Sequence, residues 1–258
     1  MNGDSLVKMR ALKFAGVAAS TVLGAVSATA AYGSISRSSQ IFGPSIYRGP
    51  GKRRTVALTF EDGPSEGTER ILEYLDRERV WATFFQCGMN VRRLPRIAGD
   101  VAAAGHQLGN HSYSHPRMTF KSREFIEREF STAQQVITEE TGITPMVVRP
   151  PYGFRWLGMR EAQQKLALLG VMWTVLGDWR LPPDKMAAHV LSGVEPGAII
   201  SLYDGRTTEP HPDISNTLEA LRRIVPLLKD QGYDFEVISD LVQDNRVVRA
   251  PRLTEVRL

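Results

Sequence analysis

Two histidines four residues apart are the strongest chemical signal in this sequence. His111 and His115 follow the short run Gln-Leu-Gly-Asn, and they are two of only five histidines in the chain. If the turn between them is helical, this spacing places both imidazoles on one face. Two imidazoles and one carboxylate can hold a divalent metal ion and leave coordination positions for water and substrate. We therefore predict that His111 and His115 bind a metal ion together.

Two adjacent carboxylates offer the acidic partner for such a site. Glu61 and Asp62 stand between the apolar run Val-Ala-Leu-Thr-Phe and a Gly-Pro turn. Neighbouring residues of an extended chain point to opposite sides, so the two carboxylates suit different tasks, such as metal ligand and general base. The structural alternative is a turn followed by a helix N-cap, in which Asp62 or Ser65 accepts hydrogen bonds from free backbone N–H groups.

Three further segments place reactive groups after apolar runs. Arg149 opens Arg-Pro-Pro-Tyr-Gly, where the prolines stiffen the chain and the fixed charge can orient a carboxylate. Asp178 stands before Trp179, and Tyr203 ends the run Ala-Ile-Ile-Ser-Leu. A rigid loop at Arg149 and core packing of the aromatic residues around Asp178 are the alternatives that require no function.

The elements that position these residues alternate between short apolar runs and helical patterns. This alternation predicts a parallel sheet, and near-continuous apolar strands agree because parallel strands are buried on both faces. An open doubly wound sheet fits as well as a barrel, but in a barrel the strand ends that carry the reactive residues meet at one rim. We therefore predict an α/β fold, a distorted (β/α) barrel with about seven parallel strands. The expected strands are 55–60, 82–86, 107–110, 146–149, 171–175, 198–203 and 235–238.

Composition excludes several classes of protein. The 258 residues are 42% hydrophobic and 23% charged, which is typical of a globular chain and not of a collagen-like, coiled-coil or disordered one. The single cysteine excludes an internal disulfide and a metal cluster held by several cysteines. The basic residues behind the net charge of +4 are scattered and accompany no nucleic-acid-binding motif. We therefore predict no nucleic-acid partner, and we expect a monomer.

The N-terminal region is typical of an export signal. A basic start is followed by the uncharged stretch 14–36, within which Ala28-Thr29-Ala30 matches the small-x-small cleavage pattern. The stretch is also long enough to stay in a membrane as an anchor, so cleavage and anchoring remain alternatives. Both predict an exported protein that is periplasmic, secreted or attached to a membrane through residues 14–36. The predicted organisation is a signal peptide or membrane anchor at 1–30, a linker at 31–54, one domain at 55–245 and a basic tail at 246–258.

In order and spacing, the reactive segments resemble the motifs of the polysaccharide deacetylase family, the carbohydrate esterases with a NodB homology domain. The resemblance covers about residues 53–242 and rests on Thr-Phe-acidic-Asp-Gly-Pro, His-Ser-x-x-His and Arg-Pro-Pro-Tyr-Gly. It implies a distorted (β/α) barrel and a divalent metal ion, with zinc expected and cobalt as the alternative. The implied activity is hydrolytic removal of acetyl groups from a cell-envelope or chitin-like polysaccharide. N-acetyl groups are expected as the substrate in preference to O-acetyl groups.

The resemblance also implies a role for each matching residue. Asp62, His111 and His115 would bind the metal ion. Glu61 would be the general base, and Arg149 would hold it ionised and oriented. The backbone N–H of Tyr152 would help to stabilise the oxyanion, and Asp178 would tune the general acid.

Two positions depart from the family pattern. The base is usually Asp where this chain has Glu61, and the general acid is usually His where this chain has Tyr203. A phenol with an ordinary pKa of about 10 is a poorer acid than an imidazole near 6.5, and a neighbouring Asp178 would raise the pKa of Tyr203 further. Two other classes therefore stay open: a catalytically impaired carbohydrate-binding relative that keeps the metal site, and a metal-dependent amidohydrolase with a non-sugar substrate.

Overall fold

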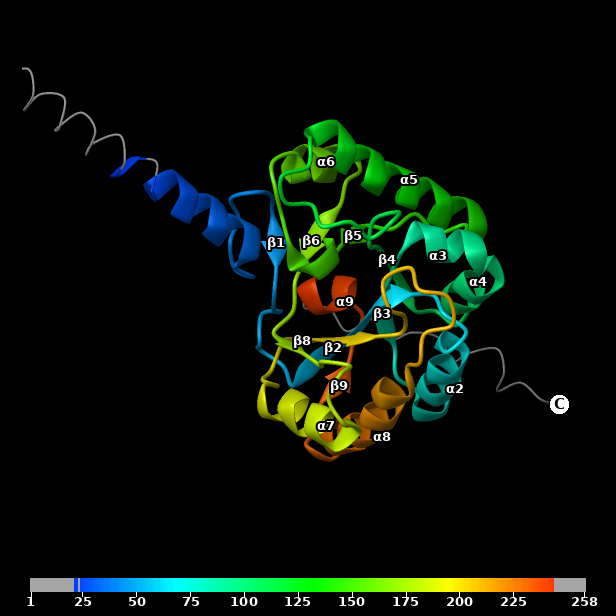
Figure 1. Cartoon of the computed structure of the whole chain (residues 1–258). Helices are drawn as coiled ribbons and strands as arrows, with labels where there is room; N and C mark the ends of the chain where they lie inside the picture. Colours follow the sequence, from blue (N-terminus) through cyan, green and yellow to red (C-terminus); the bar gives the residue numbers. More distant parts are fainter. Residues whose placement is uncertain (1–20, 23, 244–258) are drawn as a thin grey trace, which may run out of the picture.

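A curled parallel sheet with helices around it forms the body of the protein (Figure 1). The computed structural model describes residues 21, 22 and 24–243. Every strand pair in the sheet is parallel, which confirms the predicted α/β fold as an open, distorted half-barrel with β1 and β7 at its edges. The strands in sheet order are β1 (Ser45–Ile46), β6 (Leu169–Val171), β5 (Val147–Val148), β4 (Gln107–Asn110), β3 (Ala82–Gln86), β2 (Thr55–Gly63), β8 (Ala198–Tyr203) and β7 (Val175–Leu176), and β9 (Asp234–Phe235) pairs with β2 off this path.

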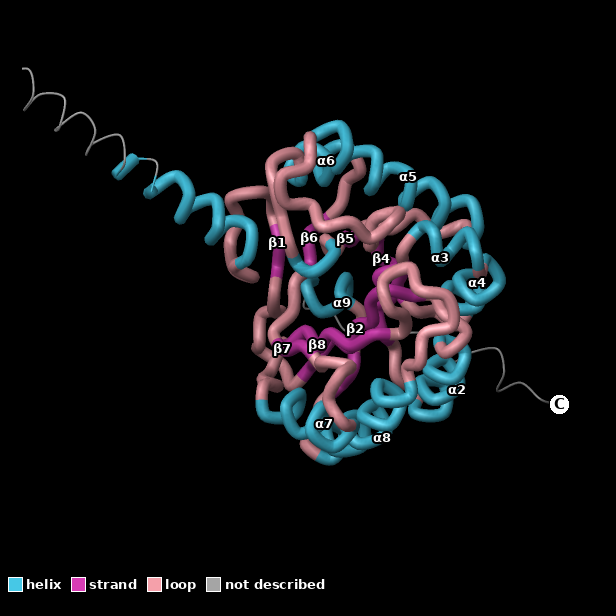
Figure 2. Tube along the Cα trace, in the orientation of Figure 1, coloured by secondary structure: helices cyan, strands magenta, loops and turns pink. Residues whose placement is uncertain are grey.

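Most of the helices lie outside the curved sheet, and α9 closes its inner side (Figure 2). Alternate residues of β2 explain this arrangement, because Val56 and Leu58 pack among the outer helices, whereas Ala57 faces a separate cluster that includes Ile238 and Leu241 of α9. Both faces of the sheet are therefore buried. The helices are α2 (Thr68–Glu78), α3 (Gly88–Arg93), α4 (Pro95–Ala103), α5 (Arg123–Thr141), α6 (Met159–Lys165), α7 (Pro183–Ser192), α8 (Ser215–Asp230) and α9 (Ile238–Gln243), with a 3₁₀ turn η1 (Pro151–Gly153).

The expected strand at 171–175 is wrong, because two strands on different sides of the sheet replace it. β6 ends at Val171, and β7 begins at Val175 on the far side of β8. The carbonyl oxygens of Val171 and Met172 accept hydrogen bonds from the side chain of Arg149 instead of from a neighbouring strand. Residues 171–175 therefore cross the open side of the half-barrel from β6 to β7.

The body of the protein begins before the expected boundary at Thr55. β1 lies within the expected linker 31–54 and pairs with β6, and Phe42 packs against Trp156 and Leu168. The buried side chain of Arg155 donates to the carbonyl oxygen of Ser39 at 2.6 Å. The segment is held largely through backbone groups, which leave no periodic pattern in the sequence.

The N-terminal helical residues 24–35 extend away from this body (Figure 1). Most of the predicted signal peptide or anchor at 1–30, and all of the predicted tail at 246–258, lie outside the described residues. Within the described part of the chain, no helix combines the length and the apolar character that crossing a membrane requires.

Candidate active site

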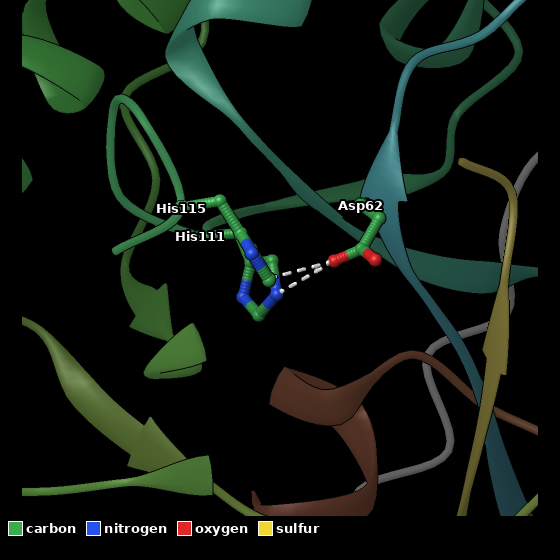
Figure 3. A group of neighbouring side chains, drawn as sticks. All are labelled: Asp62, His111 and His115. Atoms are coloured by element: carbon green, nitrogen blue, oxygen red, sulfur yellow. Dashed lines mark ion pairs between the residues drawn. The ribbon is translucent and has the colours of Figure 1, made fainter. Parts of the chain in front are cut away.

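Three potential metal ligands meet at the carboxyl ends of β2 and β4 (Figure 3). Asp62 lies at the end of β2, His111 follows β4 directly, and His115 lies in the loop beyond. Oδ1 of Asp62 is 3.2 Å from Nε2 of His111 and 2.9 Å from Nε2 of His115. All three side chains are buried, and one potential ligand atom from each lies within 4.8 Å of the others. The structure thus brings the predicted ligands together.

The hydrogen bonds around these groups fit a cation. Nδ1 of His111 is 2.7 Å from the carbonyl oxygen of Arg149, which accepts a hydrogen bond only if Nδ1 carries the proton. The lone pair of Nε2 then faces Asp62. Among the described residues, Oδ1 of Asp62 and Nε2 of His111 have no hydrogen-bond partner of good geometry. Buried polar atoms that converge without such partners suit a bound ion, and a carboxylate with two imidazoles is a donor set for zinc.

The loop that carries the histidines is not helical, so a helical turn is not what brings the two imidazoles together. Residues 111–115 form no helix, and His115 has a left-handed backbone with φ of 57°. Glu129 of α5 accepts hydrogen bonds from the backbone N–H groups of Tyr113, at 3.1 Å, and Ser114, at 2.9 Å. A carboxylate from another element therefore replaces the hydrogen bonds of a helical turn and turns both imidazoles toward Asp62.

Asp62 is held in place from the side opposite to the histidines. Its Oδ2 accepts a hydrogen bond of 2.7 Å from the backbone N–H of Thr207. The side-chain amide of Asn90 donates to the carbonyl oxygens of both Asp62, at 2.7 Å, and Thr207, at 2.8 Å. Burial by itself would raise the pKa of Asp62, but the close approach of His111 and His115 outweighs it and holds that pKa well below its usual range. The carboxylate therefore presents Oδ1 to the two imidazoles in its ionised form.

Two glycines allow the loop after β8 to approach Asp62 closely. A Cβ added at Gly205 would overlap the carbonyl oxygen of Asp62, and one added at Gly63 would overlap the carboxylate of Asp204. Asp204 is fully buried and accepts a hydrogen bond of 2.8 Å from the hydroxyl of Thr68. Burial raises the pKa of Asp204 to about 7. The glycines of the Asp-Gly-Pro and Tyr-Asp-Gly segments are thus required by packing.

Glu61 lies beside the metal ligands and above a buried arginine. Its Oε2 is 3.6 Å from Nη1 of Arg149 and 3.9 Å from Nε2 of His111. Arg149 is fully buried, and the same Nη1 donates to the hydroxyls of Thr59 and Ser201 at 2.9 and 2.8 Å. These bonds fix the guanidinium group, so that its charge acts on Glu61 from one direction.

These groups lie in a cavity of about 390 Å³ at the carboxyl ends of the strands. Tyr152 contributes to its wall, with a left-handed φ of 58° and the edge of its ring against His115 at 4.6 Å between centroids. Left-handed backbones at Asp62, His115 and Tyr152 are uncommon for residues with side chains, and such strain concentrates at functional sites. The cavity is lined by Glu61, Asp62, His115, Tyr152, Trp173, Leu176, Asp178, Trp179, Arg180, Tyr203, Arg206 and Thr207.

Comparison with known proteins agrees with this geometry. The family model described as "Polysaccharide deacetylase" matches residues 48–171. The peptidoglycan-N-acetylglucosamine deacetylase of Bacillus cereus is 32% identical over 207 residues, which cover 78% of this chain and 72% of that protein. The chain belongs to the polysaccharide deacetylase family. The resemblance predicted from the motifs is therefore confirmed.

Solved structures include both active and inactive members of the polysaccharide deacetylase family. A crystal structure of a peptidoglycan N-acetylglucosamine deacetylase superposes with a TM-score of 0.72 at 30% identity, covering 76% of this chain and 92% of that one. A CE4 family pseudoenzyme from Bacillus anthracis also gives 0.72, at 32% identity, covering 79% of this chain and 70% of that one. A mutant of that pseudoenzyme is described as having restored enzymatic activity.

In this family member, Tyr203 interacts with Glu61 and not with Asp178. The two residues are paired in the register of β8 and β2, and both line the cavity. Burial, followed by the charges of Glu61 and Asp62, raises the pKa of Tyr203 far above its usual value. The predicted direction of the shift is confirmed, but the predicted cause is wrong. Asp178 lines the cavity with its carboxylate bound to Arg180, at 2.6 Å between Oδ2 and Nη2.

Sequence reasoning missed several residues that shape this site. Thr207 acts through its backbone N–H, which is present at nearly every position and gives no signal in a sequence. Asn90 and Arg206 lie outside the five motifs and reach the site only through folding. The one available signal was the polar character of the residues that follow β8, since loops after parallel strands surround active sites.

Proposed function

We propose that this protein is a metal-dependent hydrolase that removes acetyl groups from an acetylated polysaccharide of the cell envelope or from a chitin-like chain. We expect it to act on N-acetyl groups in preference to O-acetyl groups. The convergence of Asp62, His111 and His115 at the floor of a cavity beside Glu61 carries this proposal. Family membership and a relative that is named for peptidoglycan support it. Such a substrate is accessible to an exported protein, whether it is secreted, periplasmic or anchored by residues 14–36. The predicted monomer is sufficient for this activity, because the residues proposed for the site all come from one chain.

The proposed roles divide between ion binding and proton transfer. Asp62, His111 and His115 hold a divalent ion, expected to be zinc, which when bound supplies Lewis acidity at the acetyl carbonyl. Glu61 accepts the proton of the attacking water, and Arg149 keeps Glu61 ionised and oriented.

Two further groups act later in the proposed reaction. The backbone N–H of Tyr152 donates a hydrogen bond to the oxyanion. The leaving amine needs a proton, and Glu61 can donate to it the proton that it accepted from the water. Tyr203 remains a neutral hydrogen-bond donor because its raised pKa keeps the phenol protonated. Asp178 is bound to Arg180, and Tyr203 stands where the resemblance implies the histidine that Asp178 would tune.

A catalytically impaired carbohydrate-binding protein is the second candidate. It is favoured by Tyr203, which occupies the position where the resemblance implies a catalytic histidine. The similarity to a structure described as a pseudoenzyme also supports it. Such a protein would keep the metal ion and bind the glycan, but it would release acetate slowly or not at all.

Acetate release separates the two candidates. We expect zinc- or cobalt-supplemented protein to release acetate from acetylated chitooligosaccharides or from peptidoglycan. Glu61→Gln should abolish this release and keep the metal content, because an amide cannot accept the proton. Glycan binding without acetate release favours the impaired relative, and a Glu61→Gln protein that stays active removes Glu61 from the mechanism.

A further inference from the structure

Arg206 is fixed on an aromatic ring at the wall of the candidate active-site cavity. Its guanidinium carbon lies 4.1 Å from the centre of the Trp179 ring, and both residues line the cavity. Nη2 of Arg206 donates a hydrogen bond of 2.6 Å to the carbonyl oxygen of Asp213. Stacking and this one bond hold the planar group and leave its other N–H groups for a ligand.

A second arginine on the same wall has its charge compensated. Arg180 binds the carboxylate of Asp178 through Nε, at 2.8 Å, and Nη2, at 2.6 Å. Within the described part of the chain, no carboxylate forms an ion pair with Arg206, although its charge is one of the causes that lower the pKa of the exposed Asp213 carboxyl group. Of the two guanidinium groups that line the cavity, only that of Arg206 is thus available to an anion from outside.

The charge of the cavity as a whole also favours an anion. Three carboxylates and two guanidinium groups line it, and the guanidinium of Arg149 lies directly beneath Glu61. Positive and negative side chains therefore balance. A divalent ion on Asp62, His111 and His115 would leave the loaded cavity positive, and a positive cleft raises the local concentration of anionic ligands.

We infer that Arg206, stacked on Trp179, binds a carboxylate carried by the glycan. The preferred substrate is then a chain whose sugars bear carboxylates, such as the lactyl group of muramic acid, and not a neutral chitin-like chain. A guanidinium fork matches a carboxylate in two parallel hydrogen bonds, which a hydroxyl or an amide cannot reproduce. Trp173 and Trp179 also line the cavity, so their indole groups add apolar surface beside Arg206 for the sugar rings. This inference rests on the proposed function only in taking the ligand to be an acetylated glycan.

Three tetrasaccharides that differ in charge test the inference. One alternates N-acetylglucosamine and N-acetylmuramic acid, the second is the same chain with its carboxylates converted to methylamides, and the third contains N-acetylglucosamine alone. Dissociation constants are measured by calorimetry on zinc-loaded protein carrying Glu61→Gln, which prevents turnover. We expect the acid to bind about fivefold more tightly than its methylamide, the scale of a partly exposed ion pair. The dissociation constant of a tetrasaccharide that alternates N-acetylglucosamine and a uronic acid then shows whether a carboxylate on another sugar is bound as tightly.

Substitutions at Arg206 locate the effect. Arg206→Gln should bind the acid and the methylamide equally, and Arg206→Lys should keep part of the preference because it retains the charge without the planar fork. The control is Arg117→Gln, since Arg117 lies over the rings of Phe154, at 4.7 Å, and Tyr152, at 5.5 Å, but lines a groove other than the cavity. Arg117→Gln should keep the full preference. Thermal melting confirms that each variant is folded.

The outcomes separate this inference from the proposed function. Equal affinity of the parent for acid and methylamide overturns the inference, as does a preference that survives Arg206→Gln or disappears equally in Arg117→Gln. Because affinity is measured without turnover, a protein that releases no acetate can still bear the inference out. A protein that deacetylates neutral and acidic chains alike keeps the proposed function and loses the inference.

Discussion

In the proposed mechanism, proton transfer depends on Tyr203 and Glu61. They face each other from neighbouring strands, and the phenol of Tyr203 stays protonated because burial and two carboxylates raise its pKa. A protonated phenol donates a hydrogen bond, but it cannot cycle a proton near neutral pH. Glu61 is one methylene longer than the aspartate typical of the family, and the 3.6 Å between its Oε2 and Nη1 of Arg149 exceeds a normal hydrogen bond. The departures from the family pattern at Glu61 and Tyr203 thus both affect the proton that the proposed reaction transfers to the leaving group.

Replacing Tyr203 with histidine should raise the deacetylation rate. A positioned general acid is worth about 10²–10⁴ in rate. We expect a smaller gain of about tenfold, below that range, because Asp178 must first leave Arg180 before it can orient the new imidazole. The measurement is kcat against pH, in which Tyr203→His should introduce a protonation step near the pKa of histidine, about 6.5.

Tyr203→Phe is the control for this substitution, since it removes the hydroxyl and keeps the ring. We expect it to lower the rate modestly through the loss of one hydrogen bond. If Tyr203→Phe is as active as the parent and Tyr203→His is no faster, this position has no role in proton transfer. The leaving group would then be protonated by Glu61 or by solvent.

The metal ligands can be tested without measuring activity. Elemental analysis of the purified parent should find about one divalent ion per chain, as a site with three protein ligands predicts. His111→Ala and His115→Ala should each lose most of it, because two remaining ligands bind weakly. His211→Ala is the control, since His211 is exposed and pairs with Glu66. Unchanged stoichiometry in both ligand variants would refute the site.

At the scale of elements, the sequence predicted the strands better than the loops that carry the chemistry. Apolar strands with clear turn signals, such as β3, β4 and β8, have their expected bounds. The spacing of the two histidines left the shape of their loop open, and Glu129 of α5 fixes that loop in a non-helical shape. Asp62 is bound by Thr207, which lies 145 residues further along the chain. Periodicity reports which face of an element is buried, and it does not report hydrogen bonds between loops.

Asn90 of α3 joins the end of β2 to the loop after β8, so its removal should weaken metal binding. Its amide donates to the carbonyl oxygens of Asp62 and Thr207, and Thr207 in turn orients the Asp62 carboxylate. We expect Asn90→Ala to weaken zinc affinity about tenfold, the lower range for residues that orient metal ligands. Calorimetric titration of metal-free protein measures this directly.

Asn216→Ala is the matched control for Asn90→Ala. Asn216 donates a side-chain hydrogen bond of 3.2 Å to the carbonyl oxygen of Trp179, away from the metal ligands. Its substitution should leave zinc affinity unchanged. If Asn90→Ala binds zinc as tightly as the parent, Thr207 is held without Asn90 and this account of Asp62 is incorrect.

At the scale of the whole molecule, residues before Thr55 complete the open half-barrel. β1 adds an edge strand to β6, and Phe42 fills an apolar cluster with Trp156 and Leu168. Arg155 is 3% exposed and takes its acceptors from this segment, namely the carbonyl oxygens of Ser36 and Ser39 and the hydroxyl of Ser45. A buried guanidinium without these acceptors would be strongly destabilising.

Two truncated chains should therefore differ sharply in stability. A chain that begins at Ala31 keeps every acceptor of Arg155 and should melt within about 2 °C of the full chain, a shift that corresponds to less than about 1 kcal/mol. A chain that begins at Gly49 loses Phe42 and β1, at a cost of about 4 kcal/mol, and should melt about 10 °C lower. Arg155→Leu separates the two causes. It should destabilise the Ala31 chain, in which Arg155 is hydrogen-bonded, and it should have little effect on the Gly49 chain, in which Arg155 has lost both its acceptors and the segment that covers it. Calorimetric melting of all four proteins measures this coupling, and equal melting temperatures for the two truncated chains would show that the body of the protein does begin near Thr55.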